Sequence, residues 1–118
     1  MNLEQLRTPI TEADGESAFP NTLLDSIVEG DCLAVLAELP DECVDLIVTS
    51  PPYADRRSKV YGGVKPDKYV EWFLPIADEL KRVLKSSGTF ILNIKEITVA
   101  GERHTYVIEL ILEMRQRG

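Results

Sequence analysis

Apolar positions after residue 25 change their spacing along the chain, and each spacing predicts a different element. A short apolar run at residues 27–28 ends at a Gly-Asp pair, which predicts a strand followed by a turn. Residues 32–39 repeat apolar side chains at helical spacing until a proline follows, which predicts a helix. Residues 44–49 are β-rich and almost continuously apolar, so they predict a strand that is covered on both faces of a parallel sheet.

The second half of the chain continues this alternation. Residues 50–66 contain three prolines, two adjacent glycines and four basic residues, which predicts a long loop. A helix should follow, capped by Asp67, kinked at Pro75 and ended before Gly88. Its expected apolar face comprises Tyr69, Trp72, Phe73, Ile76, Leu80, Val83 and Leu84. Residues 89–94 predict another strand, and a last helix is predicted by Val107, Leu110, Ile111 and Met114.

The order of these elements predicts the fold class. Strand, helix, strand, helix, strand and helix in succession favour an α/β layer with parallel strands and flanking helices. Residues 1–25 carry two prolines and a glycine without sustained periodicity, which predicts an irregular N-terminal lead-in. The folded domain is therefore expected over residues 26–118.

Composition and charge narrow the possible functions. The 118 residues are 44% hydrophobic and 28% charged, which suits one domain with a real core. The net charge of −7 argues against general electrostatic attachment to nucleic acid or to an anionic membrane, so any DNA contact must be local. No membrane span or targeting segment is recognised, and we expect a soluble cytoplasmic protein.

The two cysteines indicate neither a disulfide nor a metal site. Cys32 and Cys43 lie within apolar segments and lack a neighbouring cluster of histidine or cysteine. We expect two reduced, packed thiols, with neither a disulfide nor a metal site.

The strongest candidate chemistry is the tetrapeptide Ser50-Pro51-Pro52-Tyr53, which directly follows the strand at residues 44–49. Ligands of open α/β sheets bind beyond the carboxyl ends of the strands. Each proline fixes its own φ and holds the preceding residue extended, so the tetrapeptide should be stiff. A hydroxyl, a fixed carbonyl and an aromatic ring suit a flat heterocycle that has an exocyclic amino group. The alternative is a proline turn that closes the strand, with Tyr53 as packing.

The surrounding residues resemble a known family. The Gly-Asp pair at residues 30–31, Leu-Pro-Asp at 39–41, the strand and the tetrapeptide are similar to the amino-group DNA methyltransferases, which methylate cytosine N4 or adenine N6 with S-adenosylmethionine. The resemblance continues to residue 117 through Tyr69, Trp72, the segment 79–85, Gly88-Thr89-Phe90 and Asn93. It implies a partial Rossmann-like methyltransferase fold, double-stranded DNA as the partner, and a restriction-modification role. In that family a serine at the head of the tetrapeptide is typical of cytosine-N4 enzymes and an aspartate of adenine-N6 enzymes, although nothing in Ser50 excludes adenine.

The resemblance also implies a mechanism. Ser50 Oγ and the Pro51 carbonyl would accept the amino protons of a flipped cytosine and draw its N4 toward tetrahedral geometry. Tyr53 would stack on the base. Methyl transfer would be a direct in-line displacement helped by positioning and desolvation, so no catalytic cysteine is needed.

Further site residues are expected around the tetrapeptide, each with a simpler alternative. Asp31 would lie near the adenosine part of the methyl donor, or only cap a helix. Asn93 would line the pocket, or only end its strand. A phosphate-contacting rim, or else a solvated loop, is formed by Arg56, Arg57, Lys59 and Lys65. The lone histidine, His104, is expected to cap and pack; Trp72 and Phe73 are expected in the core.

The sequence lacks the glycine-rich Phe-x-Gly-x-Gly loop with which the family holds its methyl donor. In the family order that begins with the tetrapeptide, this loop and the target-recognition region follow it. We therefore expect the catalytic part of a longer or split enzyme, which lacks a C-terminal half or a complementary subunit and is inactive alone. An inactive remnant that serves as an interaction module is the alternative.

Overall fold

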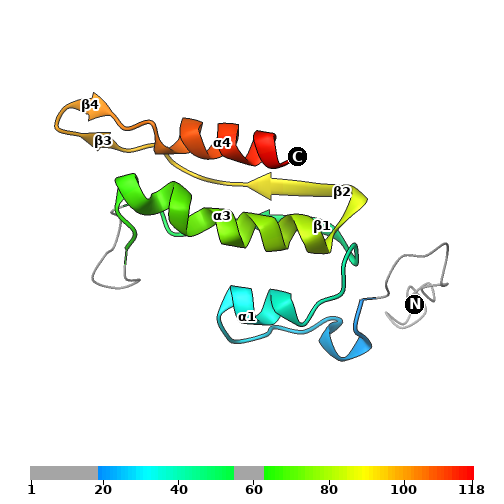
Figure 1. Ribbon diagram of the computed structural model, residues 1–118. Helices are drawn as coiled ribbons and strands as arrows, with labels where there is room; N and C mark the ends of the chain where they lie inside the picture. The colour runs from blue at the N-terminus through cyan, green and yellow to red at the C-terminus, as the bar shows by residue number, and fades with distance from the viewer. Residues whose placement is uncertain (1–18, 55–62) are drawn as a thin grey trace, which may run out of the picture.

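The computed structural model describes residues 19–54 and 63–118, which form a small α/β unit (Figure 1). Its elements in chain order are a short 3-10 helix η2 (Asn21–Leu23), α1 (Cys32–Ala37), β1 (Val44–Thr49), α3 (Pro66–Val83), β2 (Leu84–Leu92), β3 (Thr98–Val99), β4 (Glu102–Arg103) and α4 (Tyr106–Arg117). No helix of the described chain is both long enough and apolar enough to cross a membrane.

β1 and β2 form a parallel pair, and α3 provides the crossover between them. In the register, Ile47 lies beside Phe90 and Thr49 beside Leu92, whereas the pairing slips near the start of β1. Gly88 lies at this irregularity, where an added Cβ would stand only 3.0 Å from the main-chain oxygen of Asp45 and 2.6 Å from the Leu84 side chain. Glycine therefore permits the close approach of the two strands. The α/β fold with parallel strands and flanking helices is confirmed.

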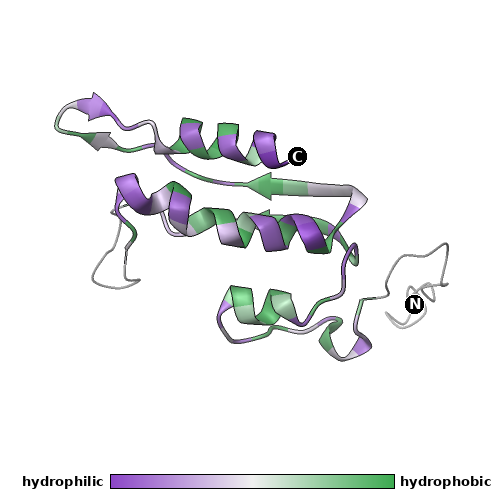
Figure 2. Cartoon of the chain, in the orientation of Figure 1, coloured by the Kyte–Doolittle hydropathy of each residue, from purple (hydrophilic) through white to green (hydrophobic). Residues whose placement is uncertain are grey.

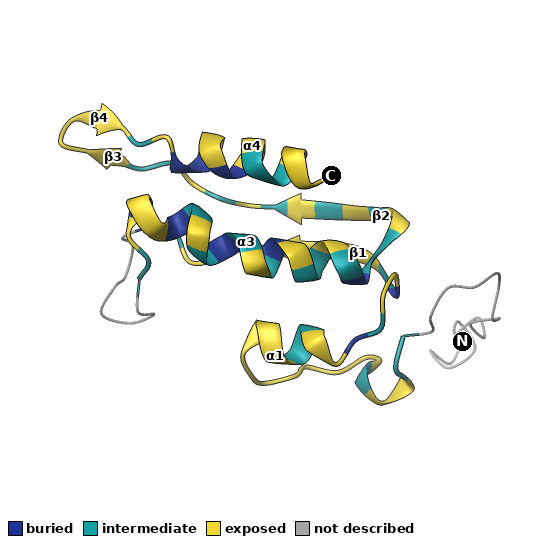
Figure 3. Cartoon of the chain, in the orientation of Figure 1, coloured by how far each residue is buried: buried dark blue, intermediate teal, exposed yellow. Residues whose placement is uncertain are grey.

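The main core lies between α3 and α4, which pack side by side (Figure 1). Figure 2 shows apolar and polar residues alternating along both helices, and Figure 3 shows buried stretches on each of them. This cluster consists of Ala54, Tyr69, Phe73, Ala77, Tyr106, Val107 and Leu110. Phe73 is buried and Trp72 packs against the cluster, so the expected core role of both residues is confirmed.

A second, smaller cluster joins α1 to the sheet. Leu39, Cys43 and Val83 are its buried members, and Phe19 and Leu23 pack against it. The guanidinium of Arg82 donates hydrogen bonds to the main-chain oxygens of residues 36 and 39, both at 2.8 Å, so it satisfies carbonyls where α1 ends. Arg82 also pairs with Glu79 and Asp41.

Several sequence predictions of strand and burial are wrong. Residues 27–28 form no strand, because β1 and β2 pair only with each other in their sheet. Ile27 is wholly exposed. The bounds of β1 are as predicted, but the strand is not covered on both faces, since Leu46 and Val48 remain exposed. Cys43 is buried and free as expected, whereas Cys32 is exposed at the start of α1 and is not packed.

Other differences concern where elements begin and end. α3 begins at Pro66 with Lys65 as its N-cap residue, not with Asp67, because proline at the first helical position has no N–H to satisfy. The helix ends at Val83, and Leu84 is already extended, so β2 begins earlier than predicted and ends at Leu92. α3 continues through Pro75, and the kink stays a prediction.

The hairpin β3–β4 was not predicted from the sequence. Its turn residues Ala100 and Gly101 have φ of 51° and 82°, and two consecutive positive φ angles suit a two-residue turn. Ala100 is an unusual residue for such an angle, so the sequence carries only half of the usual turn signal.

Candidate functional site

The parallel pairing brings the ends of β1 and β2 to one edge of the sheet. Ser50 directly follows β1, and Asn93 directly follows β2. The Asn93 main-chain N–H donates to the Thr49 carbonyl at 2.9 Å. The Asn93 side-chain amide donates to Ser50 Oγ at 3.2 Å. Two residues singled out in the sequence, 43 positions apart, are therefore in direct contact.

The tetrapeptide is joined to the aromatic core at the Pro52 carbonyl and through Ala54, the residue that follows it. Pro51 is buried and Pro52 is exposed, whereas Tyr53 is half-buried and Ala54 is fully buried. The hydroxyl of Tyr69 donates to the Pro52 carbonyl at 2.6 Å. The tetrapeptide is thus anchored at Ser50 by a strand-end amide and at Pro52 by a helix side chain.

Tyr69 belongs to a group of packed rings. Its ring centroid lies 4.9 Å from that of Tyr106 and 5.3 Å from that of Trp72. Burial raises the pKa of Tyr69 well above its ordinary value, and the neighbouring hydroxyls of Tyr106 and Tyr53 act in the same direction. Tyr69 is therefore a neutral hydrogen-bond donor over the whole range in which proteins normally work.

Asp31 caps a helix, which is one of its two expected roles, and the other role, a contact with the methyl donor, stays a prediction. Its Oδ1 accepts hydrogen bonds from the main-chain N–H groups of Leu33 at 3.0 Å and Ala34 at 3.3 Å, so Asp31 caps α1. The residue is exposed, and both cap bonds end on Oδ1, which leaves Oδ2 available to a ligand.

His104 caps α4 and links it to α3. Its Nδ1 accepts the main-chain N–H of Tyr106 at 3.1 Å, and its Nε2 lies 2.9 Å from Asp67 Oδ1. Because Nδ1 is an acceptor, the ring proton lies on Nε2 and is donated to the carboxylate. The expected capping and packing role is confirmed.

The predicted basic rim lies largely beyond the structural description. Arg56, Arg57 and Lys59 are outside the described residues, and their role stays a prediction. Lys65 is exposed immediately before α3.

Comparison with known proteins identifies the family to which this arrangement of strands, tetrapeptide and helices belongs. A family model described as a DNA methylase, of the N6/N4 group, matches residues 44–117, from the start of β1 to the end of α4. The chain belongs to this DNA methylase family.

Individual relatives support the assignment. The type II methyltransferase M.PvuII of Proteus hauseri is 31% identical over 116 residues, which are 97% of this chain and 34% of the relative. M.BglII of Bacillus subtilis is 40% identical over 74 residues, or 62% of this chain and 20% of the relative. The DNA adenine methyltransferase YhdJ of Escherichia coli K12 is 38% identical over 76 residues, or 60% of this chain and 25% of the relative.

A solved structure agrees with the fold. The PvuII DNA methyltransferase, described as cytosine-N4-specific, superimposes with a TM-score of 0.62 at 34% identity, over 74% of this chain and 32% of that chain. This DNA methylase chain spans about a third or less of the length of these relatives.

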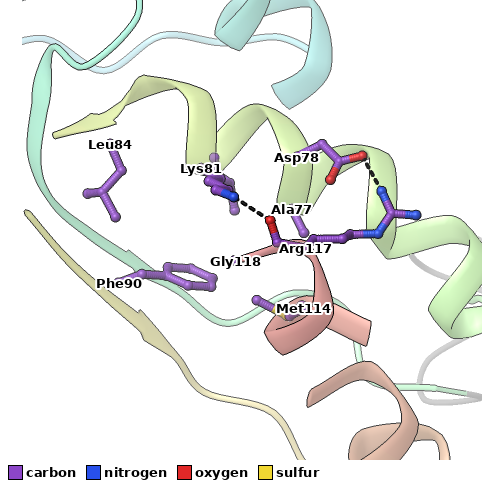
Figure 4. A pocket seen from close by; sticks show the side chains of 9 residues that line it. Ala77, Asp78, Lys81, Leu84, Phe90, Met114, Arg117 and Gly118 are labelled. Atoms are coloured by element: carbon purple, nitrogen blue, oxygen red, sulfur yellow. Dashed lines mark hydrogen bonds and ion pairs between the residues drawn. The ribbon is translucent and has the colours of Figure 1, made fainter. Parts of the chain in front are cut away.

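One apolar hollow of this part of the DNA methylase is separate from the tetrapeptide. A cavity of about 170 Å³ lies between α3, β2 and the end of α4 (Figure 4). Lys81 donates to the Arg117 carbonyl, and the Arg117 guanidinium pairs with Asp78 at 2.7 Å, so the charged residues at its rim are already engaged. Its lining residues are Ala77, Asp78, Leu80, Lys81, Leu84, Phe90, Met114, Arg117 and Gly118.

Sequence reasoning missed the polar role of Tyr69. The helical spacing placed its ring on the apolar face of α3, and the ring is indeed buried. The signal that could have revealed more is the residue type, because a tyrosine on a buried stripe needs a partner for its hydroxyl where a phenylalanine would not.

Among the described residues no group of three metal-ligating side chains occurs.

Proposed function

We propose that this chain carries the base-facing part of the active site of a cytosine-N4-specific DNA methyltransferase. The observation that carries the proposal is the hydrogen bond from Asn93 to Ser50 Oγ at 3.2 Å, at the carboxyl ends of two parallel strands. This edge is where α/β enzymes bind their ligands. Two relatives differ in the base that they methylate, since the PvuII enzyme is described as cytosine-N4-specific and YhdJ as an adenine methyltransferase.

With the bond to Asn93 in place, Ser50 can still accept a hydrogen bond from the base. A serine hydroxyl has two lone pairs and one proton. Asn93 occupies one lone pair, so the other can accept a hydrogen bond from the amino group of cytosine. The Pro51 carbonyl supplies a second acceptor in the proposal. Two acceptors draw the amino nitrogen out of conjugation with the ring, which directs its lone pair away from the base plane.

The partner is double-stranded DNA, from which the target base must be extruded to reach Ser50. Tyr53 is proposed to stack on that base, and its half-buried ring leaves part of its surface free to do so. S-adenosylmethionine supplies an electrophilic methyl group when bound, and Asp31, through its available Oδ2, is proposed to contact the adenosine part. Arg56, Arg57, Lys59 and Lys65 are proposed to contact phosphates locally, despite the acidic net charge of the chain.

The two specificities are separated by product analysis. DNA methylated by an active enzyme that contains these residues is digested to nucleosides, and N4-methylcytosine is expected as the main product. N6-methyladenine would overturn the cytosine assignment while leaving the methyltransferase assignment intact. We propose that residues 26–118 form the catalytic part and that the 118 residues alone give no turnover, so turnover by this chain unaided would contradict that part.

The role of the hydroxyl is tested by substitution. In an active enzyme that contains these residues, Ser50→Ala should reduce methyl transfer, whereas the control Ser87→Ala, on an exposed residue near the start of β2, should not. Asn93→Asp removes the side-chain N–H and should reduce transfer as well, because a carboxylate cannot donate to Ser50. Undiminished transfer by Ser50→Ala would contradict the proposed use of the hydroxyl.

A further inference from the structure

Two tyrosines at the centre of the main core each use their hydroxyl on a segment that leaves the sheet. Tyr69 of α3 and Tyr106 of α4 are both fully buried, and their ring centroids lie 4.9 Å apart. Tyr69 donates to the carbonyl of Pro52, which follows β1. Tyr106 donates to the carbonyl of Lys95, which follows β2.

Packing alone does not account for a hydroxyl at position 69. The rings of Tyr69, Trp72, Phe73 and Tyr106 fill the cluster through apolar contact, for which phenylalanine would serve at position 69 as well. A buried hydroxyl costs desolvation unless it is hydrogen-bonded. The partner that meets this need is a carbonyl of the tetrapeptide, 17 residues earlier in the chain.

The bond reaches the peptide group that directly precedes Tyr53. Pro51 and Pro52 have no N–H, so they cannot be held by donating to the neighbouring strand. The Pro52 carbonyl is part of the rigid peptide plane that continues into Tyr53. Holding this oxygen therefore orients the whole plane, and with it the direction in which the chain enters Tyr53.

We propose that Tyr69 is a positioning residue for the tetrapeptide. Through the Pro52 carbonyl it sets the peptide plane that precedes Tyr53, so the aromatic packing of α3 and α4 determines the geometry of the site. The proposal rests on the proposed function in so far as the tetrapeptide contacts the base. The hydrogen bond and its effect on the loop can be tested independently of any reaction.

The first experiment examines the loop by NMR in the 118-residue chain. In the wild type, the hydroxyl proton of Tyr69 should exchange slowly and show through-bond coupling to the carbonyl carbon of Pro52. In Tyr69→Phe, the Pro52 carbonyl and Tyr53 amide resonances should shift, and the Tyr53 amide should exchange faster with solvent. Absence of the coupling in the wild type, or unchanged Pro52 and Tyr53 resonances in a folded variant, would overturn the proposal.

Tyr106→Phe is the matched control. It removes an equally buried hydroxyl from the same ring cluster, but that hydroxyl contacts Lys95 instead of the tetrapeptide. Its effect on stability should be similar to that of Tyr69→Phe, and its effect on the Pro52 carbonyl resonance should be small. Equal shifts of that resonance in both variants would mean that loosened packing, and not the specific hydrogen bond, controls the loop.

The second experiment measures methyl transfer to DNA in an enzymatically active protein that contains these residues. Tyr69→Phe should lower kcat by about ten- to a hundredfold with little change in KM for DNA, because misplacement of reacting groups by fractions of an ångström has effects of this order. An unchanged kcat, together with a shifted Pro52 resonance, would show that the bond exists but does not position the reaction. If Ser50→Ala had no effect, the proposed function would fail, and the NMR result would still decide whether Tyr69 orients the loop.

Discussion

The two faces of the β1–β2 sheet differ sharply in solvent exposure, although the residues on both faces are similarly apolar. Ile47, Phe90 and Leu92 point to the side of α3 and α4 and are partly buried. On the other face, Leu46, Val48 and Ile91 remain 56%, 62% and 49% exposed. Figure 3 shows this alternation of exposed and partly buried residues along β2.

The apolar residues of a strand therefore indicate which of its faces can be buried, whereas the structure shows which face is covered. Continuous apolar character is typical of strands with a layer on each side. In the described chain only one layer is present. The other face, called the open face here, therefore exposes the large apolar side chains of Leu46, Val48 and Ile91, and such a surface promotes association between molecules. The following predictions compare covered positions with exposed ones, in the sheet and elsewhere in the chain.

The largest effect is expected between α3 and α4. Leu110 is fully buried, and Leu110→Ala should lower the free energy of unfolding by about 2–5 kcal/mol through lost contacts and a residual cavity. Leu112→Ala, on the exposed side of the same helix, should cost less than about 1 kcal/mol. Urea denaturation of both variants gives the comparison, and equal losses would mean that α4 does not use this face for packing.

A smaller effect is expected for two isoleucines in the sheet. Ile47→Ala, on the covered face, should lower the free energy of unfolding by about 1–3 kcal/mol. Ile91→Ala removes the same atoms from the open face and should cost less than about 1 kcal/mol. A loss at Ile91 as large as that at Ile47 would show that another surface covers the open face in solution.

A substitution on the exposed face of the β1–β2 sheet should change association between molecules more than it changes the free energy of unfolding. Val48→Lys places a charge on the exposed face of β1 and should change the free energy of unfolding by less than about 1 kcal/mol. The same change should reduce self-association, measured by sedimentation over a range of concentrations. Compact monomers in the unmodified chain at every concentration would contradict the expected association.

The smallest effect is expected on the pH dependence of stability, to which the two thiols contribute differently. Burial raises the pKa of Cys43, so the folded state keeps this thiol protonated at a pH where the unfolded state ionises it. Its contribution to stability is present below about pH 9 and decreases as the pH rises further, by at most about 1.4 kcal/mol per pH unit. The free energy of unfolding, measured from pH 7 to 10, should fall less steeply in Cys43→Ala than in the exposed control Cys32→Ala. Equal slopes in the two variants would contradict the role of Cys43.

Local patterns predicted most of the elements. Helical spacing and Asp31 located α1, the β-rich run located β1 to the residue, and the last apolar stripe located α4. Boundaries that depend on two elements at once were less accurate. β2 begins at Leu84, directly after α3, because the parallel register pairs Leu84 with Val44 and extends the strand before Gly88.

Predictions about the site divide in the same way. The residue types of Ser50 and Asn93 and their places at the ends of two strands were readable from the sequence, and the parallel pairing put them in contact. The hydroxyl of Tyr69 was not, because its partner at Pro52 lies in another segment of the chain. No spacing within α3 distinguishes a tyrosine that merely packs from one that holds a distant carbonyl.

The sequence by itself determined α1, β1, α3, β2 and α4, their order along the chain and the chemical character of the tetrapeptide, because helical and strand periodicity and proline geometry act between near neighbours. Only the tertiary structure decided which apolar surfaces are covered and which polar atoms meet. Those outcomes depend on residues that are far apart in the chain and are joined by packing. The exposed Ile27, the open face of β1 and the bond from Tyr69 to Pro52 are all of this second kind.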